Sequence, residues 1–147
     1  GAWLCHGPPL DQGFFYDSFI GDTSISQTDY ELIEKEIRKY VQDKQPFERI
    51  VMTKAEALEM CAYNPFKVQL IKNKVPEDGL TSAYRCGNLI DLCTGPHLSS
   101  ADKIKGFKII KNSSAYWLGK KENDDLQRVY GVSYPKQSQL DEYLKMQ

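Results

Sequence analysis

The sequence predicts an α+β fold with a largely antiparallel sheet. Aromatic and β-branched stretches of strand length are intermixed with segments of helical period, and no regular strand–helix–strand repeat is present. The chain has 147 residues, which suits a single domain with one sizeable core. Hydrophobic residues make up 41% and charged residues 27%, as in ordinary globular proteins.

Charge and hydropathy exclude several classes of function. Lys plus Arg number 19 and Asp plus Glu 20, so the chain lacks the basic excess of a protein that wraps duplex nucleic acid. Any nucleic-acid contact must therefore be local or shared with other domains. No run of 18 apolar residues and no secretory signal pattern occur, so we expect a cytoplasmic protein without a membrane contact.

The cysteines are scattered without a CxxC pair, which favours reduced thiols. Their even count leaves a disulfide reading open. The four are Cys5, Cys61, Cys86 and Cys93.

Residues 2–20 predict a strand, a turn at Gly7-Pro8-Pro9, and a second, aromatic strand. Residues 24–44 then predict a helix, in which Thr28 and Glu31 would form a capping box. Its apolar face would carry Ile33, Ile37, Tyr40 and Val41, and its charged face the solvated pairs Glu31–Lys35 and Glu34–Arg38.

Two shorter helices should follow a strand at 47–52. Thr53 and Glu56 form a second capping box, for a helix that ends near Ala62. Asn64 and Pro65 supply the N-cap and first residue of a helix over 66–73, and a loop over 75–80 follows.

The second half should contain two strand pairs. Residues 81–93 predict two strands joined at 86–88, and residues 107–119 predict a second pair that turns at Asn112-Ser113. Residues 123–131 predict a short helix with Gly131 at its C-cap. The last helix, within 135–147, is expected to lead into a following domain.

The stretch "NLIDLCTGPHLSS" places Asp91, Cys93 and His97 within seven residues. The Gly95-Pro96 step excludes a continuous helix, so a strand should end here in a turn, with Asp91 and Cys93 on one face. Thiolate and imidazole bind zinc, but zinc requires about four donors, or three and a water. From spacing, a metal site and a buried thiol beside a turn both stay open, and the second is favoured.

Several blocks closely resemble the editing domain of threonyl-tRNA synthetases. They are "GPPLDQGFFYD", "FKVQLI", "LIDLCTGPHL" and "AYWLGKKENDDLQRVYG", and they follow the family order over nearly the whole chain. The alanyl type, by comparison, shares the Cys-x3-His element and typically lacks the LQRxYG block. The resemblance therefore favours the threonyl type and implies its second additional domain fold.

The resemblance implies a set of editing residues. Cys93 and His97 match a Cys-x3-His motif, Asp91 matches the aspartate before it, and Lys67 matches the lysine of the middle helix. The family's His-x3-His pair is absent, so we read 1–147 as a single editing domain, truncated at its N-terminus, that is weak or inactive alone. His6 has no histidine partner four residues away and is read as a loop residue.

The implied reaction is hydrolysis of seryl-tRNA(Thr). Serine lacks one methyl group of threonine, and such a difference changes binding by only ~1–3 kcal/mol. A second site must therefore remove serine that was attached by mistake. Lys67 would anchor the terminal nucleotide or polarise the ester carbonyl, and Asp91 would hold the serine α-ammonium. Cys93 and His97 would orient substrate or water. Sequence alone leaves the general base unassigned.

The implied partner is the acceptor end of tRNA(Thr). The lysines near the final strands would either guide its phosphate backbone or simply be solvated surface residues. ATP, zinc and dimerisation would belong to the parent's synthetic domain, so no cofactor and no tight zinc are expected here. The alternatives are a non-catalytic tRNA-binding or scaffold module and an alanyl-type, zinc-dependent trans-editing hydrolase. The candidate lysines are Lys103, Lys105, Lys108, Lys111, Lys120 and Lys121, of which the first three are favoured; Leu126, Arg128 and Tyr130 should buttress the site.

Overall fold

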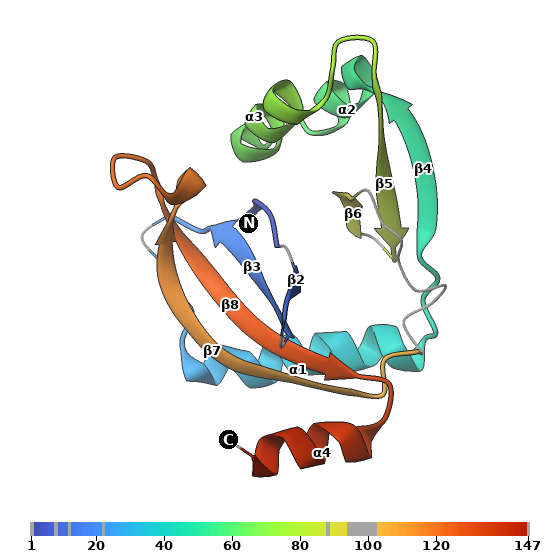
Figure 1. The fold of residues 1–147 in the computed structure, drawn as a ribbon, viewed down its shortest axis with the longest axis vertical. Helices are drawn as coiled ribbons and strands as arrows, with labels where there is room; N and C mark the ends of the chain where they lie inside the picture. Colours follow the sequence, from blue (N-terminus) through green and yellow to red (C-terminus); the bar gives the residue numbers. More distant parts are fainter. Residues whose placement is uncertain are drawn as a thin grey trace. The chain divides into compact units, whose positions relative to one another are not determined.

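The computed structural model describes residues 2–7, 9–11, 13–21, 23–87, 89–93 and 103–146. The chain divides into two compact units, one of Gly1–Lys39 with Ile104–Gln147 and one of Tyr40–Lys103. Each unit contains an antiparallel sheet and helices (Figure 1), which confirms the α+β prediction. No helix in the described ranges has the length and hydropathy needed to cross a membrane.

The first unit is built on a five-stranded antiparallel sheet in the order β1-β3-β8-β7, with β2 also paired to β3. Helix α1 runs from this unit into the second, and α4 packs on β7 and β8. The strands are β1 (Trp3–Leu4), β2 (Pro9–Leu10), β3 (Gly13–Phe19), β7 (Gly106–Tyr116) and β8 (Asp125–Tyr134); the helices are α1 (Gln27–Gln42), the 3-10 turn η2 (Trp117–Gly119) and α4 (Gln137–Lys145).

A buried ion pair joins β3 to β8 in this sheet. Arg128 Nε and Nη2 donate to the two carboxylate oxygens of Asp17 at 2.8 and 2.9 Å. The guanidinium also lies 4.0 Å from the centroid of the Phe15 ring. Because Asp17 is only 1% exposed, its charge depends on this bidentate partner.

Helix α1 begins at Gln27, so the predicted capping box of Thr28 and Glu31 is wrong. Instead, the Asp29 carboxylate accepts a hydrogen bond from the Ser26 backbone amide at 2.9 Å. The prediction that Glu34 is solvated is also wrong, because its side chain is 6% exposed and accepts from the Ile109 amide at 2.9 Å. Glu34 thereby binds a backbone donor beside the irregularity in β7 at residues 109–111.

The largest correction concerns residues 107–131. The predicted pair with a turn at Asn112-Ser113 is one strand, β7, and the predicted helix at 123–131 is strand β8. Apolar residues at 126, 129 and 130 fit a helix face locally, but β8 pairs with β3 on one side and β7 on the other. Two strand partners override the local pattern.

Gly131 is consequently a strand residue and not a C-cap. A β-carbon here would lie 2.7 Å from Cζ of Phe14 and 3.2 Å from the Lys108 carbonyl oxygen. The glycine therefore permits close packing between β3 and β8.

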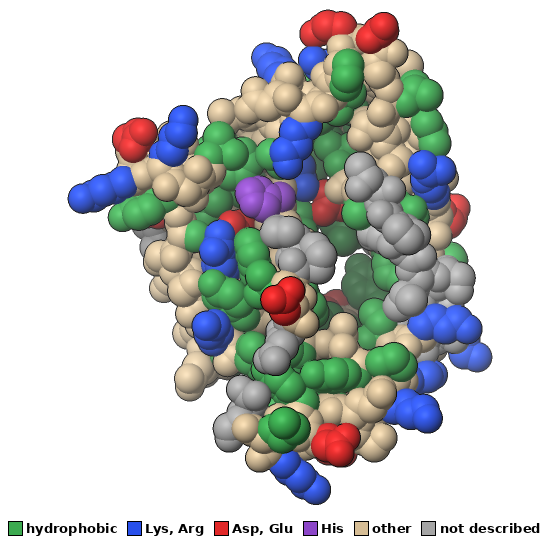
Figure 2. All heavy atoms as spheres, in the orientation of Figure 1, with side chains coloured by type: hydrophobic (Ala, Val, Ile, Leu, Met, Phe, Trp, Pro, Cys, Tyr) green, Lys and Arg blue, Asp and Glu red, His purple; other side chains and the backbone are tan. Residues whose placement is uncertain are grey.

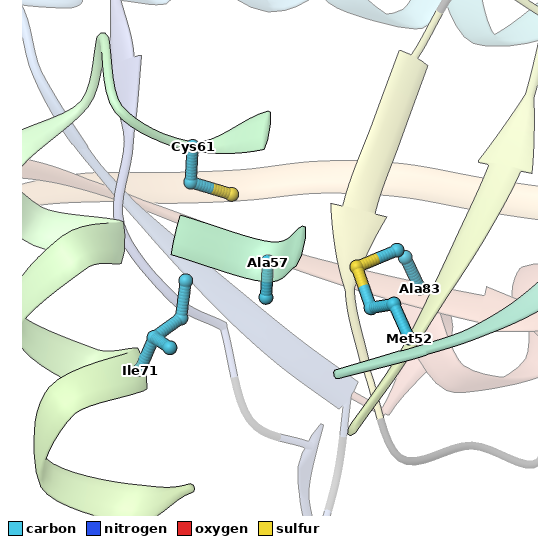
Figure 3. Close-up of a cluster of buried hydrophobic side chains, with 5 residues drawn as sticks. All are labelled: Met52, Ala57, Cys61, Ile71 and Ala83. Atoms are coloured by element: carbon cyan, nitrogen blue, oxygen red, sulfur yellow. The ribbon is translucent and has the colours of Figure 1, made fainter. Parts of the chain in front are cut away.

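The second unit has a three-stranded antiparallel sheet, β4-β5-β6, and two helices. Its buried core joins β4 and β5 to both helices (Figure 3) and contains Met52, Ala57, Cys61, Ile71 and Ala83. The elements are β4 (Glu48–Thr53), α2 (Lys54–Met60), α3 (Pro65–Lys74), β5 (Leu80–Cys86) and β6 (Leu89–Leu92).

Local signals in this unit are confirmed. Thr53 and Glu56 form the capping box of α2, with hydrogen bonds of 3.2 and 3.0 Å. Asn64 caps α3, whose first turn contains Pro65. Strands β5 and β6 form the expected hairpin, with Gly87 at φ +60° in the turn.

Replacement of Arg128 by Met should lower the free energy of unfolding by about 3 kcal/mol, because it leaves the Asp17 carboxylate buried without a counter-charge. The measurement is urea denaturation followed by circular dichroism. The matched control is Arg85→Met, which removes an exposed ion pair with Glu48 and should leave the midpoint unchanged. Equal effects of the two substitutions would contradict the importance of burial.

Candidate functional site

The candidate site in the second unit centres on an ion pair between α3 and β6. Lys67 Nζ lies 2.5 Å from Asp91 Oδ1, and the two side chains are 8% and 23% exposed. The family resemblance implied both residues as part of the site, and they are 24 positions apart in the sequence (91 minus 67). Lys67 is therefore not an exposed helix lysine.

Lys67 lies in the first turn of α3, which directs its side chain to Asp91. The Asn64 side chain caps the helix by accepting hydrogen bonds from the amides of Phe66 and Lys67 at 3.1 and 3.3 Å. Phe66 is 5% exposed and anchors the same turn in the unit. The helix thus fixes the backbone of Lys67 before its side chain reaches Asp91.

The β5–β6 hairpin presents Asp91. Asp91 pairs with Tyr84 across the hairpin, and its Oδ1 accepts a hydrogen bond from the Leu92 amide at 2.9 Å. The same oxygen therefore faces both a backbone amide and the Lys67 ammonium. The site therefore holds a fixed positive group against a fixed negative one.

Cys93 extends the same hairpin by one residue. Its amide donates to the Ser82 carbonyl at 3.0 Å, and Ser82 Oγ donates to the Cys93 carbonyl at 2.5 Å. The thiol side chain is half-buried, two residues beyond Asp91. His97, the fourth predicted site residue, lies outside the described residues, so its position relative to Cys93 stays a prediction.

Cys61 is a neighbour of the ion pair that the sequence reasoning missed. It is 6% exposed, and burial raises the pKa of its thiol. The charges of Lys67 and Asp91 act on the same pKa in opposite directions, so the thiol lies within electrostatic reach of both. In the sequence, Cys61 resembles an ordinary core residue, and no motif marks it as part of a site.

The described side chains do not fit a zinc site. In the ranges that the structure describes, no three His, Cys, Asp or Glu residues gather where they could hold a metal ion. The expectation that Cys93 and His97 hold no tight zinc stays a prediction, because His97 lies outside the described residues.

The three favoured lysines, Lys103, Lys105 and Lys108, are exposed. Lys108 Nζ lies 3.8 Å from the Glu34 carboxylate. Figure 2 shows Lys and Arg side chains on the visible surface. Contact between these lysines and RNA stays a prediction.

The structure also describes His6, two aromatic residues of the second half of the chain, and the cysteines. His6 is half-buried, with its ring centroid 5.5 Å from that of Trp117. Trp117 is 4% exposed, as expected for a core residue, whereas Tyr116 is 43% exposed. All four cysteines are free thiols.

Comparisons with known proteins agree on one family. The model of the threonyl and alanyl tRNA synthetase second additional domain matches residues 81–130. A probable cytoplasmic threonine–tRNA ligase 1 of Dictyostelium discoideum is 51% identical over 143 residues, which cover 97% of this chain and 20% of that protein. The cytoplasmic threonine–tRNA ligase of Saccharomyces cerevisiae is 45% identical over 155 residues, covering 99% and 21%.

A mitochondrial relative is equally similar. Threonine–tRNA ligase, mitochondrial 1, of Arabidopsis thaliana is 48% identical over 147 residues, covering 99% of this chain and 21% of that protein. The chain thus spans about a fifth of the length of the curated relatives it matches.

The ion pair should respond asymmetrically to mutation. Asp91→Asn should destabilise the chain by about 2 kcal/mol, because it removes the carboxylate charge that faces the nearly buried Lys67 ammonium. Lys67→Met should cost less than about 1 kcal/mol, because Asp91 retains solvent and its backbone donor. Urea denaturation at neutral pH measures both, and the reverse order would contradict the burial that defines the site.

The alkaline limb of the stability profile should depend on Cys61. Because its folded pKa is raised, its contribution to stability is full below the ordinary thiol pKa of about 8.5 and is lost as pH rises through the raised value. Denaturation curves between about pH 8 and 10 should therefore fall more steeply for the wild type than for Cys61→Ala. Parallel curves would show that Cys61 ionises as freely when folded as when unfolded.

Proposed function

The chain belongs to the threonyl and alanyl tRNA synthetase second additional domain family, and from this premise we propose that it edits mischarged tRNA. The proposed reaction is hydrolysis of the ester of seryl-tRNA(Thr), which protects the fidelity of threonyl-tRNA formation. The observation that carries the proposal is the nearly buried pair of Lys67 and Asp91. A fixed ammonium beside a fixed carboxylate suits an aminoacyl ester, which has a cationic amine and a polarisable carbonyl.

The need for a second site follows from small differences in binding energy. Serine lacks one methyl group of threonine but keeps the hydroxyl, so a synthetic site that excludes valine still accepts serine. A missing methyl changes affinity by only ~1–3 kcal/mol, which limits discrimination in one step. An editing pocket that admits serine and excludes threonine by size supplies the second step.

The geometry supports distinct roles for the two charged groups. Asp91 is the natural partner for the α-ammonium of the seryl group, since opposite charges attract strongly away from bulk water. An arriving ammonium would join or displace Lys67 Nζ at Asp91. Lys67 would then be directed toward the ester carbonyl or the terminal ribose, where a cation stabilises developing negative charge.

Cys93 and His97 complete the proposed site. The backbone of Cys93 is fixed by two hydrogen bonds to Ser82, so its thiol is presented from a rigid edge. We assign both residues to the orientation of substrate or water. The reaction also requires a proton acceptor, which the described residues leave unassigned.

The wider setting is part of the same proposal. The substrate would be the acceptor end of tRNA(Thr), and a cytoplasmic location is proposed, although a mitochondrial relative is similar. ATP binding, zinc binding and dimerisation are proposed for a synthetic domain outside this chain.

The test is deacylation of seryl-tRNA(Thr) by this chain, both alone and joined to any residues that precede it in its gene. We expect weak activity alone and serine-selective hydrolysis once a His-x3-His segment is present. Threonyl-tRNA(Thr) is the control substrate. If the longer protein hydrolyses neither ester, a non-catalytic tRNA-binding or scaffold module becomes the better explanation.

In the active protein, Lys67→Ala and His97→Ala should each lower turnover by at least about 100-fold, since both would act on the reacting groups. The matched control is Lys72→Ala, which removes an exposed lysine from the same helix. Circular dichroism checks folding. Unchanged turnover in folded Lys67→Ala would remove the lysine from the site.

A further inference from the structure

We propose that Asn64 is a positioning residue for editing: its side chain sets the place of the Lys67 ammonium. This inference rests on the proposed function for its catalytic consequence, but its structural part is independent of it. Asn64 is 1% exposed, and its side chain binds the backbone of the first turn of α3. Its effect would pass through the backbone of α3.

The side chain of Asn64 binds the backbone of the lysine itself. Its Oδ1 accepts from the amides of Phe66 and Lys67 at 3.1 and 3.3 Å. The Asn64 amide in turn donates to the Cys61 carbonyl at 2.9 Å, and its carbonyl accepts from the Val68 amide at 3.1 Å. One residue therefore joins the end of α2 to the first turn of α3.

Lys67 occupies an unfavourable position for a cation. The first turn of a helix carries unsatisfied amides and the positive end of the helix dipole, which repel an ammonium group. Burial to 8% exposure adds a desolvation cost. Asn64 moderates the first effect by accepting from two of the amides, and Asp91 moderates the second.

The opposite end of α3 is also fixed. Lys54 Nζ donates to the carbonyl of Lys72 in the last turn at 3.4 Å and pairs with Glu77 at 3.0 Å. Lys54 is itself 7% exposed, so this contact is held within the unit. With both ends restrained, loss of the Asn64 cap should displace the first turn, where Lys67 lies, more than the rest of the helix.

A cap that only stabilises the fold would behave differently from a positioning cap, and α2 provides the comparison. Thr53 caps α2 in the same unit, with its side chain accepting from the Glu56 amide at 3.2 Å. Its cap binds no residue of the proposed site. Thr53→Ala should therefore destabilise the unit without moving Lys67, whereas Asn64→Ala should do both.

The experiment compares Asn64→Ala, Asn64→Ser and Thr53→Ala with the wild type in the serine-selective protein. We expect Asn64→Ala to lower kcat for seryl-tRNA(Thr) by about tenfold or more at nearly unchanged KM, since small misplacements of a reacting group are costly. Asn64→Ser retains an oxygen acceptor and should restore most of the rate. Thr53→Ala should leave kcat unchanged.

A second measurement does not require catalysis. Limiting acetic anhydride labels lysine amines, and mass spectrometry gives the labelling of Lys67 relative to that of exposed Lys72. Asn64→Ala should raise this ratio several-fold, because a misplaced Lys67 loses burial and its partner. Thr53→Ala and Asn64→Ser should leave the ratio near that of the wild type.

The outcomes separate the two proposals. If the wild type does not hydrolyse seryl-tRNA(Thr), the proposed function fails and the labelling ratio alone decides the positioning role. Equal effects of Asn64→Ala and Thr53→Ala on kcat or labelling would overturn that role in favour of plain stabilisation. If Asn64→Ala does not fold, Asn64→Gly replaces it, since glycine is tolerated at N-caps but lacks a side-chain acceptor.

Discussion

The nearly buried ammonium of Lys67 is a constraint on the packing of the second unit. A nearly buried cation in the first turn of a helix is unfavourable on two counts, and it persists because Asp91 lies 2.5 Å away. This requirement links α3 to β6 and brings together residues that are distant in sequence. A neighbouring thiol, Cys61, titrates under the influence of both charges.

The first unit has a comparable charge pair with a different consequence. Asp17 and Arg128 are joined by two hydrogen bonds between adjacent strands, and Phe15 lies against the guanidinium. Hydrogen bonding to Asp17 raises the pKa of Arg128, so the guanidinium stays charged at any pH that the fold tolerates. The two hydrogen bonds of the Arg128 guanidinium join Asp17 and Arg128 at paired positions of β3 and β8.

The prediction of local structure succeeded where a short-range interaction decides the conformation. The caps at Thr53 and Asn64 are formed by side chains that reach amides two or three residues away, so their sequence signatures are reliable. It failed at residues 123–131, where spacing compatible with a helix became strand β8. The partners of β8 in β7 lie 9 to 28 positions away (125 minus 116 and 134 minus 106). Those in β3 lie 109 to 117 positions away (127 minus 18 and 131 minus 14), which no local window contains.

The sequence by itself determined the class of fold, the family resemblance and the identity of Lys67 and Asp91 as site candidates. It could do so because caps, turns and motif residues are encoded in short stretches and in their order along the chain. Three features become visible only in the packed fold. Lys67 is buried against Asp91, Glu34 is buried beside β7, and Gly131 lies within a strand. Burial and long-range pairing arise when separate elements pack, so the free energy that fixes them is absent from any isolated segment.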